Sequence, residues 1–252
     1  MADPRGIVSS SVTSRPFPFV NVYMKSPEIV SLQGPVAIGK TGLIRELGEL
    51  PNTRCVLEHL QFIDQNRLKI PISPRDKETF FANQLFFLSV ECQRWKISKL
   101  ALQDKNTVFF DRDPLDTVIF CFSYPHVFEP DWDILHQIEP VIIEMYRFGS
   151  IGLADRIIRL TAPWEVIKQR ADDNKEQQRE QLRTTWLFDM FVDFVLAQAP
   201  DSLALRIVTV EASGSTKTTK NSILSSLEMS DSSGEEITPD YLVIQDLFRL
   251  FE

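Results

Sequence analysis

The stretch Gly34–Thr41 reads GPVAIGKT and satisfies the pattern G-x-x-x-x-G-K-[ST]. It follows an apolar, β-type run at Glu28–Gln33 and precedes a helical pattern at Thr41–Leu50. A strand before this pattern and a helix after it are the context in which it forms a phosphate-binding loop, or P-loop. Glycine is scarce elsewhere, since four of the nine glycines fall between Gly34 and Gly48. The backbone is therefore expected to approach a ligand closely here.

The chemistry of phosphate binding explains these residue types. Gly34 and Gly39 allow the chain to curl so that successive N–H groups point at a phosphate. The positive end of the following helix adds to the field. Lys40 is expected to reach the β- and γ-phosphates, and the Thr41 hydroxyl to bind Mg²⁺. The alternative, a glycine-containing turn with a surface lysine, does not account for the strand and helix that flank the pattern.

Composition narrows the class of protein. The chain has 252 residues, is 43% hydrophobic and 25% charged, and carries a formal net charge of −8. These values exclude wholesale disorder and fit one large α/β domain or two small ones. The acidic balance argues against a nucleic-acid polymer as partner. Three scattered cysteines without a C-x-x-C pair indicate neither a disulfide scaffold nor a zinc site.

Targeting and membrane signals are weak. No apolar run reaches the ~18 residues that a membrane-spanning helix needs, and the longest candidate, Phe80–Val90, is interrupted by polar residues. Residues 1–26 are expected to form a flexible tail. Arg5 and Arg15 lie there among several serines, but Asp3 is present as well, so a mitochondrial presequence remains an alternative. We expect a soluble, cytoplasmic protein without a membrane partner.

Short β-type runs alternate with helical patterns along the chain. The runs are rich in Val, Ile and Phe with little alternation, as in parallel strands buried on both faces. They are Glu28–Leu32, Arg54–Leu57, Thr107–Phe110, Arg156–Leu160 and Leu205–Val210. This alternation predicts βαβ units and an α/β fold, a three-layer α/β/α sandwich around a parallel five-stranded sheet.

Three segments between and after these runs have their own patterns. In Asp76–Gln103 an apolar face is expected at Phe81, Leu85, Leu88, Cys92, Trp95 and Lys99, and in Gln177–Gln198 at Leu182, Trp186, Met190 and Phe194. Half of the residues in Ser213–Gly234 are Ser or Thr, which is typical of a mobile insertion. A last helix is expected at Pro239–Phe251.

Two classes of P-loop protein lack their further motifs here. A guanine-binding switch needs D-x-x-G and N-K-x-D, but the third strand leads into Asp111-Arg112-Asp113 and Asn174-Lys175 precedes Glu176. Large motor and AAA-type ATPases are usually longer and carry sensor elements that are not evident in this sequence.

The chain resembles the deoxynucleoside kinase and thymidylate kinase group of small P-loop kinases, in order from Glu28 to the C-terminus. Besides the phosphate loop, four stretches carry this resemblance. They are Arg54–Glu58, which ends in a carboxylate; the long helix with Phe80, Gln84 and Phe87; Val108–Asp113, with its Asp-Arg pair; and Asp155–Arg170, which looks like a strand, a turn and a lid helix. The resemblance implies a single kinase-like domain over 27–252, ATP and Mg²⁺ as cofactors, and a small-molecule acceptor.

The resemblance also implies roles for individual residues. Glu58 corresponds to the general base that accepts a proton from the acceptor hydroxyl, Asp111 and Thr41 to the Mg²⁺ ligands, and Arg112 to a group that contacts the acceptor or compensates charge. The implied catalytic residues are Glu58, Arg112 and Lys40. ATP binding falls to Gly34, Ala37, Ile38, Gly39, Lys40, Thr41, Gly42 and Arg170. Acceptor binding falls to Glu58, Phe80, Gln84 and Arg112, with Phe80, Phe81, Phe86 and Phe87 placed to sandwich a base.

Structural interpretations compete with these roles. Glu58 could be an exposed carboxylate at a strand end, and Asp111–Arg112 a surface salt bridge. Most phenylalanines must belong to the core. Arg170 precedes a segment of alternating charge that includes Lys175 and Arg179 and is typical of a solvated helix face. The histidines show no metal spacing, and Cys92 and Cys121 are expected in the core.

Several positions depart from the group. Asp113 follows the Asp-Arg pair, where a third charge is expected to alter the acceptor site. Few arginines follow Arg170, Gly42 stands where a second hydroxyl residue is common, and Pro35 removes one N–H donor from the loop. These departures suggest a divergent member.

Three functions remain open from the sequence. The first is an ATP–Mg²⁺-dependent kinase that phosphorylates a hydroxyl of a small molecule, foremost a (deoxy)nucleoside. A nucleoside monophosphate or other metabolite kinase is an alternative, for which Arg54, Arg67, Lys69 and Arg75 supply basic charge. A non-catalytic, nucleotide-binding regulatory module is the third, with Ser213–Gly234 as a partner-binding segment. A homodimer through Asp76–Gln103 would be in keeping with the resemblance.

Overall fold

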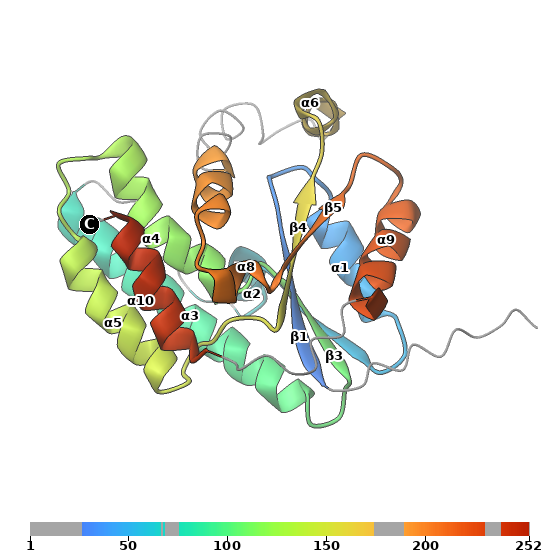
Figure 1. Ribbon diagram of the computed structural model, residues 1–252, viewed down its shortest axis with the longest axis horizontal. Coiled ribbons are helices and arrows are strands. Elements are labelled where there is room, and N and C mark those ends of the chain that lie inside the picture. Colours follow the sequence, from blue (N-terminus) through green and yellow to red (C-terminus); the bar gives the residue numbers. More distant parts are fainter. Residues whose placement is uncertain (1–26, 67, 69–75, 174–188, 230–237, 252) are drawn as a thin grey trace, which may run out of the picture.

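Five parallel strands form the sheet at the centre of the protein, here a computed structural model (Figure 1). The structure describes residues 27–66, 68, 76–173, 189–229 and 238–251. The strand order is β2-β3-β1-β4-β5, and every neighbouring pair is parallel. The strands are β1 Glu28–Gln33, β2 Thr53–Val56, β3 Thr107–Asp111, β4 Arg156–Thr161 and β5 Ile207–Glu211. All five predicted runs are thus confirmed, as is the parallel sheet.

Consecutive strand residues face opposite layers of helices. Ile29 and Val108 belong to one core cluster, whereas Val30 and Phe109, each one residue later, belong to the other. Because both faces are buried, the strands lack alternation of polar and apolar residues. The two clusters confirm the three-layer sandwich.

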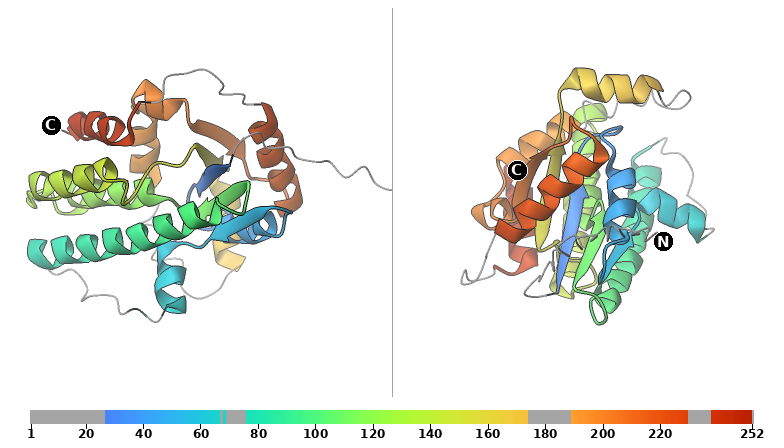
Figure 2. Two further views of the ribbon diagram at one scale, coloured as in Figure 1. Left: turned by 90° about the horizontal axis from the view of Figure 1, so that it is seen from below. Right: turned by 90° about the vertical axis from the view of Figure 1, so that its right-hand side faces the viewer.

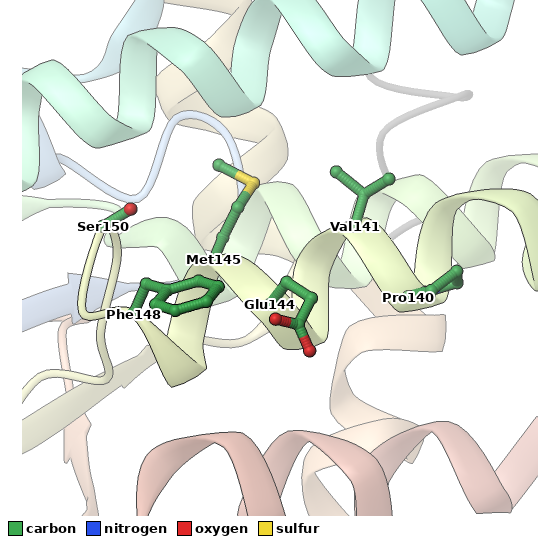
Figure 3. Close-up of a pocket in the computed structure, with 6 residues that line it drawn as sticks. All are labelled: Pro140, Val141, Glu144, Met145, Phe148 and Ser150. Carbon is green, nitrogen blue, oxygen red and sulfur yellow. The ribbon is translucent and has the colours of Figure 1, made fainter.

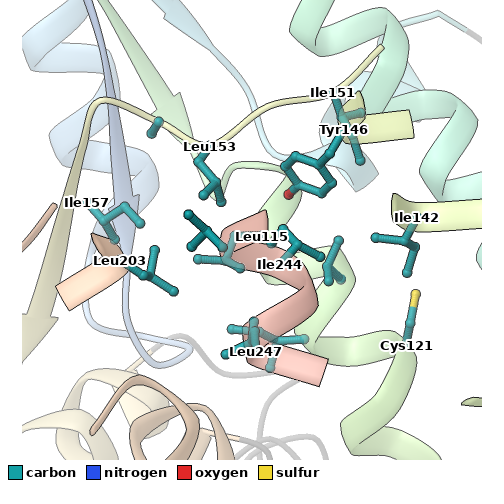
Figure 4. Packing of buried hydrophobic residues seen from close by; sticks show 14 of the residues in the cluster. Leu115, Cys121, Ile142, Tyr146, Ile151, Leu153, Ile157, Leu203, Ile244 and Leu247 are labelled. Atoms are coloured by element: carbon teal, nitrogen blue, oxygen red, sulfur yellow. The ribbon is translucent and has the colours of Figure 1, made fainter. Parts of the chain in front are cut away.

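Helices cover both faces (Figures 1 and 2). One face packs against α1 and α9, and the other against α3, α4, α10 and residues 189–197, with α5 outside them; Figure 4 shows the larger cluster. The helices are α1 Lys40–Gly48, α2 His59–Gln65, α3 Lys77–Ala101, α4 Pro114–Phe128, α5 Leu135–Arg147, α6 Trp164–Asp173, α8 Asp201–Ala204, α9 Thr216–Met229 and α10 Asp240–Phe248, followed by the short helix η1 Arg249–Phe251.

Helix α3 begins where the sequence predicts, and it buries more than the predicted face. The Asp76 side chain accepts a hydrogen bond from the Thr79 N–H and caps the helix. Of the predicted apolar face, Leu88 and Trp95 are buried, whereas Leu85 and Lys99 are exposed. The buried residues are instead largely polar: Asn83, Gln84, Glu91, Arg94 and Ser98 join Phe80, Leu88, Val90 and Trp95. The predicted face is thus confirmed in part, since Phe81 and Cys92 also pack against the larger core cluster, and polar residues beside it are buried as well.

The predicted face of Gln177–Gln198 was wrong where it can be checked. Residues 189–197 are helical, but Met190 is 52% and Phe194 57% exposed. Val192 and Val195 face the core instead. Leu182 and Trp186 lie outside the described residues, as do the expected tail at 1–26 and residues Arg67, Lys69, Arg75, Lys175 and Arg179.

The prediction of a mobile insertion at Ser213–Gly234 was wrong for most of that segment. Thr216–Met229 forms helix α9, and its Ile223 is buried in the cluster shared with α1. Lys220 pairs with Glu46 of α1, Nζ to Oε2 3.1 Å. The hydroxyl-rich composition belongs to the exposed side of this helix, where Ser and Thr reach solvent or bond the preceding turn. Residues 230–234 lie outside the described part of the chain.

In the described part of the chain, no helix combines the length and the apolar character that crossing a membrane would require.

Candidate active site

The phosphate loop has the backbone that its glycines suggest. Gly34 has φ 144° and Gly39 has φ 100°, both in the region that favours glycine. A Cβ at position 34 would stand 2.7 Å from the Leu160 carbonyl oxygen of β4, so a side chain there would collide with backbone. Ala37 also has positive φ, 65°. Gly39 caps α1, and this places the N-terminus of that helix at the loop.

Lys40 lies inside the loop. Its Nζ donates to the carbonyl oxygens of Gly34, at 2.7 Å, and Pro35, at 2.9 Å. Burial, followed by the positive charge of Arg112, lowers the pKa of Lys40 to about 8. A bound phosphate would supply a negative charge that favours the protonated form of Lys40, in place of the water that burial excludes.

Thr41 and Asp111 form a pair with the donor set that Mg²⁺ prefers. The Thr41 hydroxyl donates to Asp111 Oδ2 at 3.1 Å. Asp111 ends β3, is fully buried, and its Oδ1 has no hydrogen-bond partner. Burial raises the pKa of this carboxyl. Mg²⁺ is usually held by one or two carboxylates together with waters and substrate phosphates, so the orphaned oxygen beside a hydroxyl fits a magnesium site.

Arg112 connects the phosphate loop to α4 and α2. Its Nη1 donates to both oxygens of Asp116 at 2.9 Å, and its Nη2 to the Gly34 carbonyl oxygen at 3.3 Å. Its Nε lies 3.7 Å from Glu58 Oε1. Burial disfavours the charged form, but Asp116 and Glu58 outweigh it and raise the pKa of Arg112. Arg112 is therefore a permanent cation beside the loop.

Glu58 lies next to this cation rather than alone at a strand end. It precedes α2 as the N-cap residue, and its side chain is 26% exposed. A carboxylate that is half-buried, paired with Arg112 and still open to solvent can accept a proton from an entering hydroxyl. The structure thus brings together Lys40, Thr41, Glu58, Asp111 and Arg112 at the carboxyl ends of β1, β2 and β3.

Arg170 reaches the loop from α6. Its Nη1 donates to the Ile38 carbonyl oxygen and its Nη2 to the Gly214 carbonyl oxygen, both at 3.0 Å. Gly214 lies just after the edge strand β5, so this one guanidinium links the phosphate loop to the segment that follows β5. Arg170 thus contacts the phosphate loop, and its role in ATP binding stays a prediction.

Asp113 does not face the predicted acceptor site. It is fully buried; Gln33 Nε2 donates to its Oδ1 at 2.8 Å, and the Ala154 N–H to its Oδ2 at 3.3 Å. Burial raises the pKa of this carboxyl to about 7. Asp113 binds β1 to the segment before β4, so the third charge of this stretch is structural.

Phe80 and Gln84 lie in a separate environment, between α3 and α4. Phe80 stacks on Tyr124, with ring centroids 5.0 Å apart, and Phe120 and Trp132 complete an aromatic cluster. Gln84 is buried and accepts a weak hydrogen bond from the Cys121 thiol at 3.5 Å. The structure gives neither residue a contact with the loop, and their predicted role at the acceptor stays a prediction.

Four functional candidates were missed in the sequence. Asp116 of α4 pairs with Arg112, which lies four residues earlier and just before that helix, and the short spacing of the two opposite charges was a usable signal. Glu91 and Arg94 form a fully buried ion pair on α3. Asp189 is buried, and this burial raises the pKa of its carboxyl. The positive charges of Arg112 and Lys40 lower it in part, which shows that Asp189 lies near both. No sequence pattern marks Asp189, because it comes from a distant helical segment.

A surface cavity of about 470 Å³ lies elsewhere, on α5 (Figure 3). It is lined by Pro140, Val141, Glu144, Met145, Phe148 and Ser150. None of the predicted site residues lines it, so it is not the predicted acceptor pocket.

A family model described as an AAA domain matches residues 29–193, more than half of the chain. The chain belongs to this family of AAA domains. The match spans the phosphate loop, Glu58, Asp111 and Arg112. This description differs from the expectation made from the sequence, where AAA-type ATPases were set aside on chain length and missing sensor elements. Among curated proteins, none matches the chain.

Solved structures of a kinase share the fold of this AAA-domain chain. Deoxyadenosine kinase from M. mycoides with bound dATP is 18% identical, with a TM-score of 0.51, and the match covers 79% of this chain and 98% of that one. The same enzyme with the products dCMP and a flexible dCDP is 17% identical, with a TM-score of 0.52 and the same coverage. The fold is that of a P-loop deoxynucleoside kinase, and the resemblance seen in the sequence is confirmed at this level.

Proposed function

We propose that the protein is an ATP–Mg²⁺-dependent phosphotransferase that moves the γ-phosphate to a hydroxyl of a small molecule, foremost a (deoxy)nucleoside. One observation carries the proposal: the orphaned Asp111 Oδ1 and the Thr41 hydroxyl lie beside the Lys40 loop, and the Glu58–Arg112 pair lies next to them. Phosphoryl transfer needs alignment and charge compensation more than covalent chemistry, and these groups are suited to both.

Each group has a role that its surroundings support. Lys40 and the loop N–H groups bind the phosphates, and Arg170 closes the loop at Ile38. Asp111 and Thr41 hold Mg²⁺, which when bound compensates charge on the phosphate oxygens. Glu58 takes the proton from the acceptor hydroxyl, and Arg112, whose Nε lies 3.7 Å from Glu58 Oε1, orients that carboxylate.

The acceptor class rests on the shared fold. The structural relative is a deoxyadenosine kinase, and its two structures carry dATP or the products dCMP and dCDP. At 17–18% identity the fold is shared and the acceptor is not thereby assigned. A planar base as part of the acceptor is taken from the resemblance to the kinase group, because Phe80 and Gln84 are themselves buried between α3 and α4.

The test is ADP release from ATP–Mg²⁺ with a panel of nucleosides, nucleoside monophosphates and other hydroxylated metabolites. Acceptor-dependent turnover is expected with a nucleoside. Glu58→Gln is expected to lower kcat about 100-fold or more, as loss of a general base does, and Lys40→Ala to abolish turnover. Exposed matched controls, Glu144→Gln and Lys96→Ala, are expected to retain it.

Other results would assign the other functions. Turnover only with monophosphates would make the protein a nucleotide kinase. Lys40-dependent ATP binding without turnover on any acceptor would overturn the proposal and leave a nucleotide-binding regulatory module.

A further inference from the structure

A single buried arginine holds together the strand ends that carry the site. Arg94 of α3 is 0% exposed. Its Nε donates to the Leu57 carbonyl oxygen at 2.8 Å, and its Nη2 to the carbonyl oxygens of Asp111, at 2.7 Å, and Arg112, at 2.8 Å. Leu57 is the residue before Glu58, so all three carbonyls belong to or adjoin residues proposed to act on ATP or the acceptor.

The guanidinium is fully used. The two remaining N–H groups, on Nη1, donate to the Glu91 carboxylate at 2.7 and 2.6 Å. Arginine has five donors in a rigid, planar fork, and all five have a partner here. The carbon at the centre of the guanidinium lies 4.5 Å from the centre of the Phe110 ring, which stacks the fork against β3.

The carbonyls that Arg94 binds are in an unusual backbone. Arg112 has φ 56°, in the left-handed region that a non-glycine residue rarely adopts. Such a conformation persists only when the surroundings impose it. Arg94 binds the carbonyl oxygen of Asp111, which precedes this residue, and the carbonyl oxygen of Arg112 itself. The Arg112 N–H donates to the Leu32 carbonyl oxygen at 3.2 Å. Without the fork, the turn that directs Asp111 and Arg112 into the site loses two of its anchors.

Glu91, the partner of Arg94, also contacts residues of two further helices, α4 and α2. The Thr117 hydroxyl of α4 donates to Glu91 Oε1 at 3.0 Å, and His59 Nδ1 of α2 lies 3.7 Å from that oxygen. His59 directly follows Glu58. The Glu91–Arg94 pair therefore touches both sides of Glu58 and both residues of the Asp-Arg pair, yet neither charge is exposed to a ligand.

From this geometry we propose that Arg94 is a positioning residue: through Leu57, Asp111 and Arg112 it sets the relative placement of the proton acceptor, the metal carboxylate and the active-site cation. This inference rests on the proposed function for its effect on turnover. Its effect on Mg²⁺ binding rests only on Asp111.

The test uses Arg94→Lys and the double variant Glu91→Gln/Arg94→Met. Lysine keeps a buried positive charge opposite Glu91 but has three donors and no fork, so it cannot span three carbonyls. The double variant removes both charges together and avoids leaving one of them unpaired in the interior. Arg249→Met, which removes an exposed arginine paired with Asp246, is the matched control.

Two readouts separate positioning from folding. First, kcat is expected to fall about 100-fold in both variants, as expected for a misplacement of about 1 Å, while the Kd for ATP without Mg²⁺ stays within about threefold, because the loop and Lys40 do not touch Arg94. Secondly, binding of a fluorescent ATP analogue is measured with and without Mg²⁺. Wild type is expected to bind more tightly with Mg²⁺, and both variants are expected to lose that gain but keep the metal-free affinity.

The outcomes distinguish this inference from the proposed function. If wild type turns over no acceptor, the proposed function fails, and the Mg²⁺-dependent binding still decides the role of Arg94. If both variants fold cooperatively and keep the wild-type kcat and Mg²⁺ gain, or lose only melting temperature, Arg94 is merely structural and the inference is wrong. If the double variant does not fold, Arg94→Lys decides alone.

Discussion

Lys40 illustrates how the tertiary environment sets the chemistry of one side chain. Any exposed lysine has a pKa above 10, but burial and the neighbouring Arg112 lower the pKa of Lys40 to about 8. Its hydrogen bonds go to the Gly34 and Pro35 carbonyl oxygens of its own loop. An arriving phosphate favours the charged form, so nucleotide binding and protonation of Lys40 are linked.

The affinity for ATP should therefore fall with rising pH. Below its pKa Lys40 carries the charge that phosphate needs; above about pH 8 a growing fraction is neutral and must regain a proton on binding. Between about pH 7.5 and about pH 9.5 we expect the Kd for ATP to rise roughly 20-fold. Titration of a fluorescent ATP analogue across this range measures it. Lys40→Ala should bind weakly, with a Kd that is flat over the same range; an equal slope in that variant would assign the effect to another group.

Helices α3 and α9 show why composition misjudges an element. The buried face of α3 carries Asn83, Gln84, Glu91 and Arg94, because it lies against the carboxyl ends of strands where polar groups meet. Helix α9 is rich in Ser and Thr, but one side presents Ile223 to the core shared with α1. In both cases the partner surface, rather than the average composition of the element, decides which side is buried.

Substitution in α9 should thus affect the stability of the whole domain. Ile223 is 0% exposed, and Ile223→Ala is expected to lower the free energy of unfolding by about 3 kcal/mol, through lost transfer energy and a residual cavity. Ser225 lies on the exposed side of the same helix, and Ser225→Ala is expected to change it by less than about 0.5 kcal/mol. Urea unfolding followed by circular dichroism compares the two. Equal, small effects would mean that α9 is not packed on the domain.

Across the whole molecule, Asp113 joins parts that are far apart in the sequence. It caps α4 after β3, accepts from Gln33 at the end of β1, and accepts from the Ala154 N–H before β4. The negative charges of Asp116 and Glu91 add to the burial that raises its pKa to about 7, whereas the two hydrogen bonds oppose it. The folded protein thus holds a proton here that the unfolded chain, with an aspartate pKa near 3.9, releases.

The stability of the fold should consequently decline as the pH rises. The contribution of protonated Asp113 is fully present below the unfolded pKa, is lost as the pH rises toward about 7, and does not change further above it. The raised pKa values of Asp111 and Asp189 act in the same direction, whereas the lowered pKa values of Asp116 and His59 act against it, so the comparison with Asp113→Asn isolates the contribution of Asp113. Melting temperatures between about pH 4 and about pH 8 are expected to fall with pH in wild type and to fall less in Asp113→Asn. A parallel decline in the two proteins would refute the role of Asp113.

Local sequence determines the layers and the phosphate loop of this protein. The five strands could be predicted because both sheet faces are covered and the strand segments are rich in Val, Ile and Phe with little alternation. The loop could be predicted because glycines, a lysine and a hydroxyl at fixed spacing leave the backbone few alternatives. Glu58, Asp111 and Arg112 follow strands of one parallel sheet, whose carboxyl ends share an edge, and this order placed them near the loop.

Contacts between distant segments account for what the sequence did not reveal. Arg94 binds carbonyls 17, 18 and 37 residues away, and nothing in its own helix marks it as different from Arg147 on the surface of α5. The orientation of Asp113 depends on Gln33, 80 residues earlier. Whether a charged side chain faces solvent, substrate or core depends on the groups that pack against it. Those groups come from distant segments and meet only when the helices pack on the sheet.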